Sequence, residues 1–166
     1  MKRINLYRAP IVVCFTLLAI VTGLSYANPP QPAKPVDSSK SVKWGPAPPM
    51  LPKGAEIAVL AGNPAEAGLL SLRLKVPKGY IVPPHWHPMD GQVTVLSGTV
   101  NLGMGEKLDK SKSQEFSAGG FYSLPAQKAH FAWTETGAVI QVSLMGPFAI
   151  TYVNPADDPR GSVAKK

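Results

Sequence analysis

Short apolar runs separated by turn residues fill the chain from about residue 56 onward. In LSLRLKV, residues 70–76, leucine or valine alternates strictly with Ser71, Arg73 and Lys75. A period of two is typical of a β-strand with one buried face. No segment beyond residue 27 shows a convincing helical period, so we expect an all-β domain. The expected strands are residues 57–61, 69–76, 92–98, 99–105, 120–125, 130–133, 138–146 and 148–153.

The spacing of these runs indicates how they connect. Gly98-Thr99 predicts a tight turn between two strands, because glycine tolerates the backbone conformations that turns require. Lys107 to Ser113 predicts a polar, flexible connection. Many short strands joined by frequent turns are typical of a β-sandwich or a β-barrel.

The first 27 residues have the pattern of a signal peptide. Lys2, Arg3 and Arg8 precede an apolar stretch from Ile11 to Leu24, which is short for a stable membrane span. Ser25-Tyr26-Ala27 then places small residues where a signal peptidase cuts. We expect cleavage after Ala27 and a periplasmic or secreted protein; the alternative is an uncleaved N-terminal anchor.

Cysteine content and charge exclude several classes of function. The single cysteine, Cys14, lies inside the apolar stretch, so the mature chain would have no thiolate site and no disulfide. Three of the 17 basic residues also lie in the leader. The remaining 139 residues therefore carry 14 basic and 10 acidic side chains, a net charge of +4. No basic run with interleaved aromatic residues indicates nucleic-acid binding.

Composition divides the mature chain into three parts. Residues 28–52 hold eight prolines and predict an extended linker that forms no core, although Trp44 is a candidate anchor on the domain. Residues 53–154 form the expected β-domain. Residues 155–166 form a polar C-terminal tail. No membrane span is expected in the mature chain.

Two of the three histidines stand one residue apart in PPHWHP. In an extended strand, residues i and i+2 point to the same face, so His85 and His87 can direct two imidazoles into one space. Trp86 then points to the opposite side. The third histidine, His130, opens another expected strand, and a closed barrel could bring it to the same point. Imidazole is a common ligand of Zn, Fe, Cu and Ni.

The spacing around these histidines resembles the two motifs of the cupin superfamily. In the first motif a glycine precedes His-X-His by five residues and a second glycine follows; in the second, glycine, proline and histidine recur at fixed spacing. The stretches PPHWHP, TVLSGTVNLGMG and GPFAITYVNP most resemble small secreted single-domain bacterial cupins. The resemblance implies an antiparallel jelly-roll β-barrel with a metal near its wider mouth. The matching residues are Gly79, His85, His87, Gly98, Gly119, Pro125 and His130.

The chain departs from the cupin pattern at the position of the usual glutamate ligand. That position falls on Gly91 or Gln92, and the spacing back from Gly98 selects Gly91. Asp90 is adjacent, but a neighbouring residue on a strand points to the other face. The second motif has Gln127 where a glycine is usual. Either three histidines alone hold the metal, or loss of the carboxylate has turned the barrel into a binding module.

The first reading implies a metal-dependent oxidoreductase of the dioxygenase type acting on a small molecule. Three neutral nitrogens leave up to three positions open on an octahedral ion, and some cupins use Fe(II) in this way. We favour Fe(II), with Zn, Mn, Ni or Cu as alternatives. The rival functions are a non-catalytic ligand-binding or sensor cupin, and a structural zinc barrel.

Several other residues are candidates for the pocket wall, and exposed strand edges would allow a homodimer. The sequence assigns no catalytic residue beyond the metal ligands and names no substrate. The candidate pocket residues are Asp90, Gln92, Met104, Tyr122 and Gln141.

Overall fold

Ten β-strands and two short 3-10 helices make up the part of the chain that the computed structural model describes, residues 42–161. The expected signal peptide and most of the expected linker lie outside these residues. No helix within them is long and apolar enough to cross a bilayer. The strands are β1 (Gly45–Pro46), β2 (Glu56–Ala61), β3 (Gly68–Val76), β4 (Ile81–Trp86), β5 (Gly91–Met104), β6 (Ser113–Ser117), β7 (Phe121–Leu124), β8 (His130–Trp133), β9 (Ala138–Gly146) and β10 (Thr151–Tyr152). The helices span Lys110–Lys112 and Pro155–Asp157.

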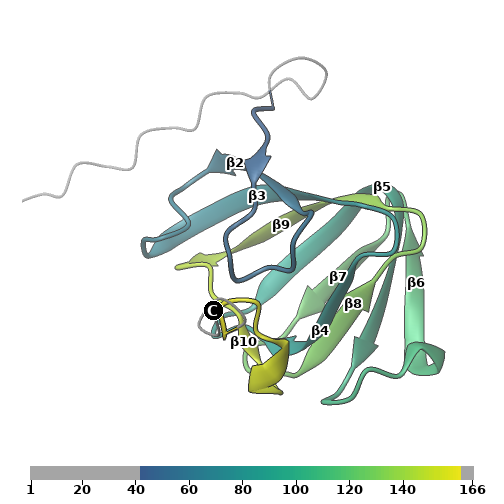
Figure 1. The fold of residues 1–166 in the computed structure, drawn as a ribbon. Helices are drawn as coiled ribbons and strands as arrows, with labels where there is room; N and C mark the ends of the chain where they lie inside the picture. The colour runs from purple at the N-terminus through teal and green to yellow at the C-terminus, as the bar shows by residue number, and fades with distance from the viewer. Residues whose placement is uncertain (1–41, 162–166) are drawn as a thin grey trace, which may run out of the picture. The chain divides into compact units, whose positions relative to one another are not determined.

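All strand pairs are antiparallel, and the strands curl into a jelly-roll barrel. The main order is β1-β2-β3-β9-β5-β8-β4-β10, with β6 and β7 also paired to β5. Figure 1 shows β2, β3 and β9 on one side of the barrel and β4, β8 and β6 on the other. The expected all-β class and jelly-roll architecture are confirmed.

The alternation in β3 produces the core of the barrel. Leu70 and Leu72 are fully buried and Leu74 is nearly so, whereas Lys75 on the opposite face is exposed. Lys75 forms an ion pair with Glu56 on the neighbouring strand. Burying large aliphatic side chains contributes about 1.5–3 kcal/mol each, so this inward row is a main source of stability.

The expected turn at Gly98-Thr99 is wrong, because β5 continues through it as one strand of 14 residues. Its first half pairs with β9 and β7, and its second half pairs with β8 and β6. The register shifts between Val95 and Ser97, and Gly98 has φ +73°. A bulge next to a left-handed glycine bends a strand without reversing it. The bend carries β5 from one sheet to the other.

Two further expectations differ from the structure. Within the expected connection at residues 107–113 a 3-10 helix forms, and β6 follows it unpredicted, because its sequence SQEFS has only Phe116 as an apolar residue packed on the core. The expected strand at residues 148–153 is reduced to β10, which pairs only with β4.

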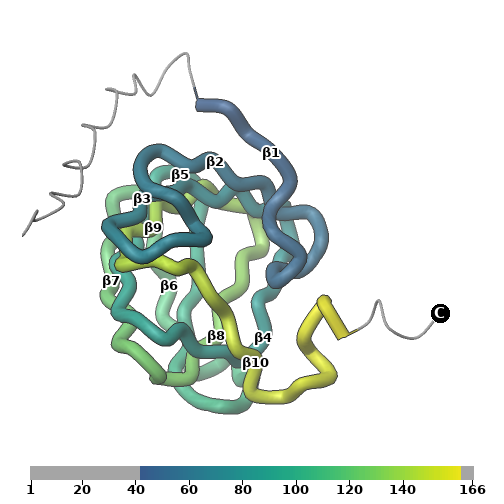
Figure 2. The backbone as a smooth tube through the Cα atoms, turned by 90° about the vertical axis from the view of Figure 1, so that its left-hand side faces the viewer, coloured from purple at the N-terminus to yellow at the C-terminus, as the bar shows by residue number. Residues whose placement is uncertain are grey.

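The last part of the expected linker packs on the barrel. β1 pairs with β2, and Figure 2 shows the segment that carries β1 running beside β2. Trp44 lies next to Lys75, with the ammonium 5.3 Å from the ring centroid, so this residue does anchor the segment. The expectation that the linker forms no core is wrong at Leu51, which is 6% exposed. Apolar residues between the prolines can therefore still enter the core.

Hydrogen bonds from two tyrosines fix this segment. The Tyr80 hydroxyl donates to the Pro52 carbonyl at 2.7 Å, and the Tyr152 hydroxyl donates to the Met50 carbonyl at 2.8 Å. Because these tyrosines lie 72 residues apart in the sequence, they tie residues 50–52 to two distant parts of the chain, with Leu51 directed into the barrel.

Candidate metal centre

The three histidines lie close together in the structure. His85 lies on β4, His87 directly follows that strand, and His130 is the first residue of β8. His85 and His130 are register partners on these two neighbouring antiparallel strands. His87 lies two residues beyond His85, on the same side of the chain. His85 is 4% exposed and His130 is 2% exposed, so both imidazoles lie inside the barrel. The expected convergence of all three histidines is what the structure shows.

Each imidazole is held by a backbone carbonyl at its Nδ1 atom. Nδ1 of His85 lies 2.7 Å from the Pro83 oxygen, and Nδ1 of His130 lies 2.9 Å from the Lys128 oxygen. Nδ1 of His87 lies 2.8 Å from the Ala149 oxygen. A carbonyl oxygen only accepts, so each neutral ring carries its proton on Nδ1. The lone pair of each ring therefore lies on Nε2, which is the arrangement that orients ligand histidines in metal sites.

The spacing of the rings fits one small ion. Ligand atoms of all three histidines lie within 4.8 Å of one another. The ring centroids are 4.3 Å apart for His85 and His130, 5.0 Å for His85 and His87, and 5.2 Å for His87 and His130. Two nitrogens at about 2.1 Å from a single ion lie at most about 4.2 Å apart, so small ring movements would complete the site.

Burial keeps the imidazoles neutral. It lowers the pKa of His130 to about 4. It also lowers the pKa of His85 well below its usual value, with the neighbouring rings of His130 and His87 adding to the effect. The pKa of His87 is also lowered by burial. Neutral imidazole is the form that binds metals, so near neutral pH the three rings need lose no proton to do so.

The metal-free protein should therefore lose stability as the pH falls. An unfolded histidine has a pKa near 6.5, so between pH 6.5 and 4 the unfolded chain binds a proton that folded His130 does not. The contribution of His130 to the free energy of unfolding is fully present above pH 6.5 and decreases as the pH falls toward 4. The expected loss between pH 7 and pH 5 is about 2 kcal/mol from His130 alone.

Urea unfolding of chelator-treated protein at several pH values measures this loss. His130→Gln is the matched control, because a neutral amide of similar reach does not titrate. Its unfolding free energy should fall less between pH 7 and pH 5. An equal fall in both proteins would show that groups other than His130 cause the pH dependence.

A cavity of about 80 Å³ adjoins the three imidazoles. Apart from the histidines and Tyr122, its wall is aliphatic or aromatic. Phe148 stacks on His87 with ring centroids 6.0 Å apart and an interplanar angle of 24°. The cavity can therefore hold a small molecule next to the Nε2 atoms in mostly apolar surroundings. The other lining residues are Leu51, Leu74, Val82, Val93, Leu102, Leu124, Ala132, Ile140, Val142 and Ile150.

Of the five candidate pocket residues, only Tyr122 lines this cavity. Asp90 is exposed and accepts a hydrogen bond from the Ala126 N–H at 2.7 Å. Gln92 is exposed on the outer face of β5, and Gln141 accepts a hydrogen bond from Arg73 Nε at 3.2 Å on the outer face of β9. Met104 is 52% exposed and borders an open surface groove instead. Contrary to expectation, these four residues do not line the cavity. Strand parity turns Gln92 and Gln141 outward. Asp90 lies just before β5, and Met104 is the last residue of β5, where it borders the surface groove.

The two departures from the cupin motifs have different structural consequences. Gly91 lies on the inward face of β5 and lines a smaller cavity of about 20 Å³ together with His87. A Cβ at this position would meet only Leu124 Cβ, at 4.0 Å, so space remains where the usual glutamate would be.

Gln127 has φ 59°, a left-handed conformation that glycine adopts readily, and its N–H donates to the His87 carbonyl. The backbone of the second motif is thus preserved without its glycine.

The sequence did not indicate three residues that contribute to the site. Leu51 was assigned to the linker, and Phe148 and Ala149 were assigned to a regular strand. The stretch GPFAITYVNP carried part of the cupin resemblance, and this was the one signal that residues 146–155 contribute to the barrel mouth.

The fold and the three inward histidines define a small single-domain cupin. A family model described as "Domain of unknown function (DUF4437)" matches residues 30–151, and the chain belongs to that family. No curated protein matches the chain.

Solved structures share the fold at low sequence identity. The polyketide cyclase RemF from Streptomyces resistomycificus has a TM-score of 0.59 and 19% identity, covering 78% of this chain and 92% of its own. A "putative acetylacetone dioxygenase" from Methylibium petroleiphilum has a TM-score of 0.56 and 18% identity, covering 76% and 85%. An RmlC-like cupin from Shewanella frigidimarina has a TM-score of 0.53 and 15% identity, covering 68% and 91%.

Proposed function

We propose that this protein binds a divalent transition metal through His85, His87 and His130 and uses it in an oxidoreductase reaction of the dioxygenase type on a small molecule. One observation carries the proposal: three buried imidazoles, each with Nδ1 held by a backbone carbonyl, converge beside a cavity with apolar walls. The hydrogen bonds at Nδ1 leave the Nε2 lone pairs to face one another, and one metal ion would accept all three.

Fe(II) is the metal we favour, because three nitrogen ligands leave room for both a substrate and O2. When bound, it would supply the redox chemistry that the chain itself lacks. The structure from Methylibium petroleiphilum has the same fold and is described as a putative acetylacetone dioxygenase, which supports this type of reaction. Zn, Mn, Ni and Cu also accept imidazole ligands, and zinc would restrict the site to non-redox chemistry.

The chain's own residues perform the remaining tasks. The carbonyls of residues 83, 128 and 149 orient the imidazoles. Phe148 covers one face of His87, and mostly aliphatic side chains form the wall of the cavity. A preorganised site with apolar walls strengthens polar interactions with the reacting groups.

Metal analysis and nitric oxide binding test the proposal without knowledge of the substrate. Protein purified without a histidine tag is loaded anaerobically with Fe(II), and its iron content is measured. Nitric oxide, an O2 analogue, is then added and the iron–nitrosyl EPR signal is recorded. We expect about one iron per chain and a nitrosyl signal, because the site has open positions.

The other outcomes point to different functions. Stoichiometric metal without a nitrosyl signal would indicate a closed structural site. Failure to bind Fe(II), Mn, Ni, Cu or Zn would contradict the proposed function, and the cavity would then belong to a metal-independent binding module.

A further inference from the structure

The donor set of the proposed metal site lacks a negative charge. The three ligand imidazoles are neutral when they coordinate a metal. No carboxylate lines the adjoining cavity among residues 42–161, and Gly91 stands where a glutamate would be. A divalent ion held there would keep its full charge in apolar surroundings, and a buried charge requires a partner.

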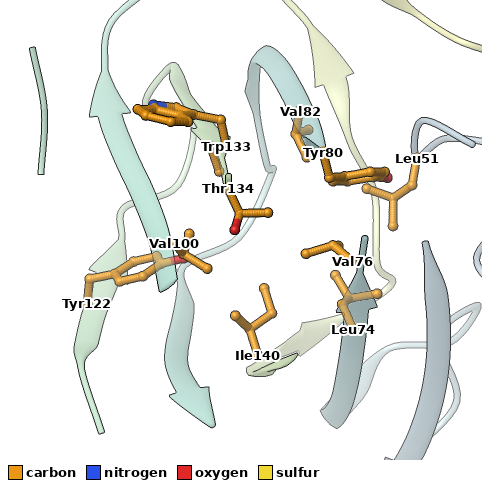
Figure 3. Close-up of a pocket in the computed structure, with 11 residues that line it drawn as sticks. Leu51, Leu74, Val76, Tyr80, Val82, Val100, Tyr122, Trp133, Thr134 and Ile140 are labelled. Carbon is orange, nitrogen blue, oxygen red and sulfur yellow. The ribbon is translucent and has the colours of Figure 1, made fainter. Parts of the chain in front are cut away.

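The space next to the histidines continues into a second apolar cavity of about 60 Å³. The two cavities share six lining residues, so they are neighbouring parts of one barrel interior. Figure 3 shows the aliphatic side chains Leu74, Val76 and Ile140 on one side of the second cavity, with Tyr122 and Val100 reaching in from another. A molecule bound at the histidines can therefore extend an apolar body in this direction. The shared residues are Leu51, Leu74, Val82, Tyr122, Ala132 and Ile140.

Most polar side-chain atoms around the second cavity already have a partner. The Tyr80 hydroxyl donates to the Pro52 carbonyl, and the indole N–H of Trp133 donates to Ser113 Oγ at 3.2 Å. The Thr134 hydroxyl accepts a hydrogen bond from the Gly137 N–H at 3.0 Å.

Tyr122 is the exception among the three tyrosines of residues 42–161. Its side chain is nine-tenths buried, it lines both cavities, and its hydroxyl has no hydrogen-bond partner among the described residues. Its ring packs on Phe116 with centroids 4.8 Å apart, which fixes its position. No fully buried side-chain nitrogen or oxygen of residues 42–161 lacks a partner, so this hydroxyl retains some accessible surface and is free to bind a group inside the cavity.

We propose that the substrate is a small anion with a mostly apolar body and a second oxygen atom. This proposal rests on the proposed metal site. The anionic oxygen replaces the missing carboxylate at the metal, and the second oxygen accepts a hydrogen bond from Tyr122. Tyr122 is therefore a specificity-determining residue. Simple oxo-carboxylates represent this chemical class.

Matched pairs of acids test the role of Tyr122. Co(II)-loaded protein is titrated with 3-oxobutanoate, 4-oxopentanoate and 5-oxohexanoate, and with butanoate, pentanoate and hexanoate, while the visible Co(II) spectrum is followed. We expect one oxo-acid to bind about tenfold more tightly than its matched alkanoate, as one buried hydrogen bond allows. Tyr122→Phe should remove this preference and leave the alkanoate affinity unchanged.

Substitution at Gly91 tests the charge argument independently. Gly91→Glu places a carboxylate beside His87, and Gly91→Gln adds a neutral group of the same size. At equal cobalt loading, Gly91→Glu should weaken binding of the acids at least tenfold more than Gly91→Gln. Equal effects of the two substitutions would overturn the proposal that an anion completes the site.

Thermal unfolding of metal-free protein provides a readout that needs no ligand. Tyr80→Phe and Tyr152→Phe each remove a hydrogen bond to a carbonyl and should lower Tm by several degrees. Tyr122→Phe should leave Tm unchanged or raise it, because no partner is lost. A clear fall in Tm for Tyr122→Phe would give its hydroxyl a structural role and overturn the proposal.

The outcomes separate this proposal from the proposed function. If cobalt binds but no oxo-acid is preferred, or if Tyr122→Phe keeps the preference, the assignment of Tyr122 and of the substrate class is wrong while the metal site stands. If cobalt does not bind, the proposed function fails, and with it the substrate proposal that rests on it.

Discussion

His130→Ala should lower the affinity for Fe(II) or Co(II) by at least about 100-fold. Removing a group that merely orients a ligand histidine typically costs 10- to 100-fold in metal affinity, so removing the ligand itself should cost more. His130 is 2% exposed and its Nδ1 is held by the Lys128 carbonyl. No other metal-binding side chain joins the cluster among residues 42–161, so nothing described can replace it.

Competition with a chelator measures this affinity, and metal-dependent stabilisation gives a second reading. A ligand at 100 times its Kd raises the free energy of unfolding by about 2.7 kcal/mol. Wild-type protein should gain stability by this mechanism, whereas His130→Ala should gain little at the same metal concentration. His85→Ala should behave in the same way.

Gln92→Ala is the matched control for the histidine substitutions. Gln92 is close to the histidines in sequence but exposed on the outer face of β5, so metal affinity should not change. An unchanged affinity in His130→Ala, or a comparable loss in Gln92→Ala, would contradict the assignment of the ligands.

The sequence was sufficient to predict which histidines converge because two local rules apply to them. Period-two alternation places His85 and His87 on one face, and motif spacing adds His130. The same parity rule turns Gln92, the neighbour of inward-facing Gly91, away from the cavity. Strand alternation also predicted β3 closely, and the apolar runs between turn residues predicted β8 and β9.

The features that the sequence did not reveal depend on contacts between distant parts of the chain. The Nδ1 atom of His87 is fixed by the carbonyl of Ala149, a backbone group that carries no residue-type signal. Leu51 enters the core from a proline-rich segment because two distant tyrosines hold its neighbours. Glycine at position 98 can adopt the positive φ that either a turn or a bend in a strand requires. Only the pairing of β5 with β9 and β8 determines that the chain bends here and does not reverse.

Because β5 crosses from one sheet to the other, its Gly103 pairs with Phe131 on β8, and substitution of this glycine should have a large effect on stability. Gly103→Ala should lower the free energy of unfolding by about 3 kcal/mol, at the upper end of the usual cost of overpacking a core. A Cβ at this position would lie 2.0 Å from Cζ of Phe131, its register partner on β8. Phe131 is fully buried, so its ring has no free space to enter. The backbone of Gly103 has no positive φ, and the effect is therefore one of space alone.

The same substitution should also weaken the metal site. Phe131 follows His130 directly on β8, so a shift of the ring moves the strand that presents this imidazole. We expect the metal affinity of Gly103→Ala to fall although no ligand is altered. Gly91→Ala is the control for stability, because it lies on the same strand and its Cβ would meet only Leu124 Cβ, at 4.0 Å.

A double-mutant cycle separates this contact from a general intolerance of β5 to substitution. Phe131→Leu shortens the side chain that the new Cβ would strike, so it should cost less in the Gly103→Ala background than in the wild type. Urea unfolding of the four proteins gives the interaction energy. Additive losses would show that the Gly103 backbone, rather than the space under the Phe131 ring, is what the fold requires. A favourable interaction of about 1 kcal/mol or more would show that this glycine is needed to seat the ring that follows His130.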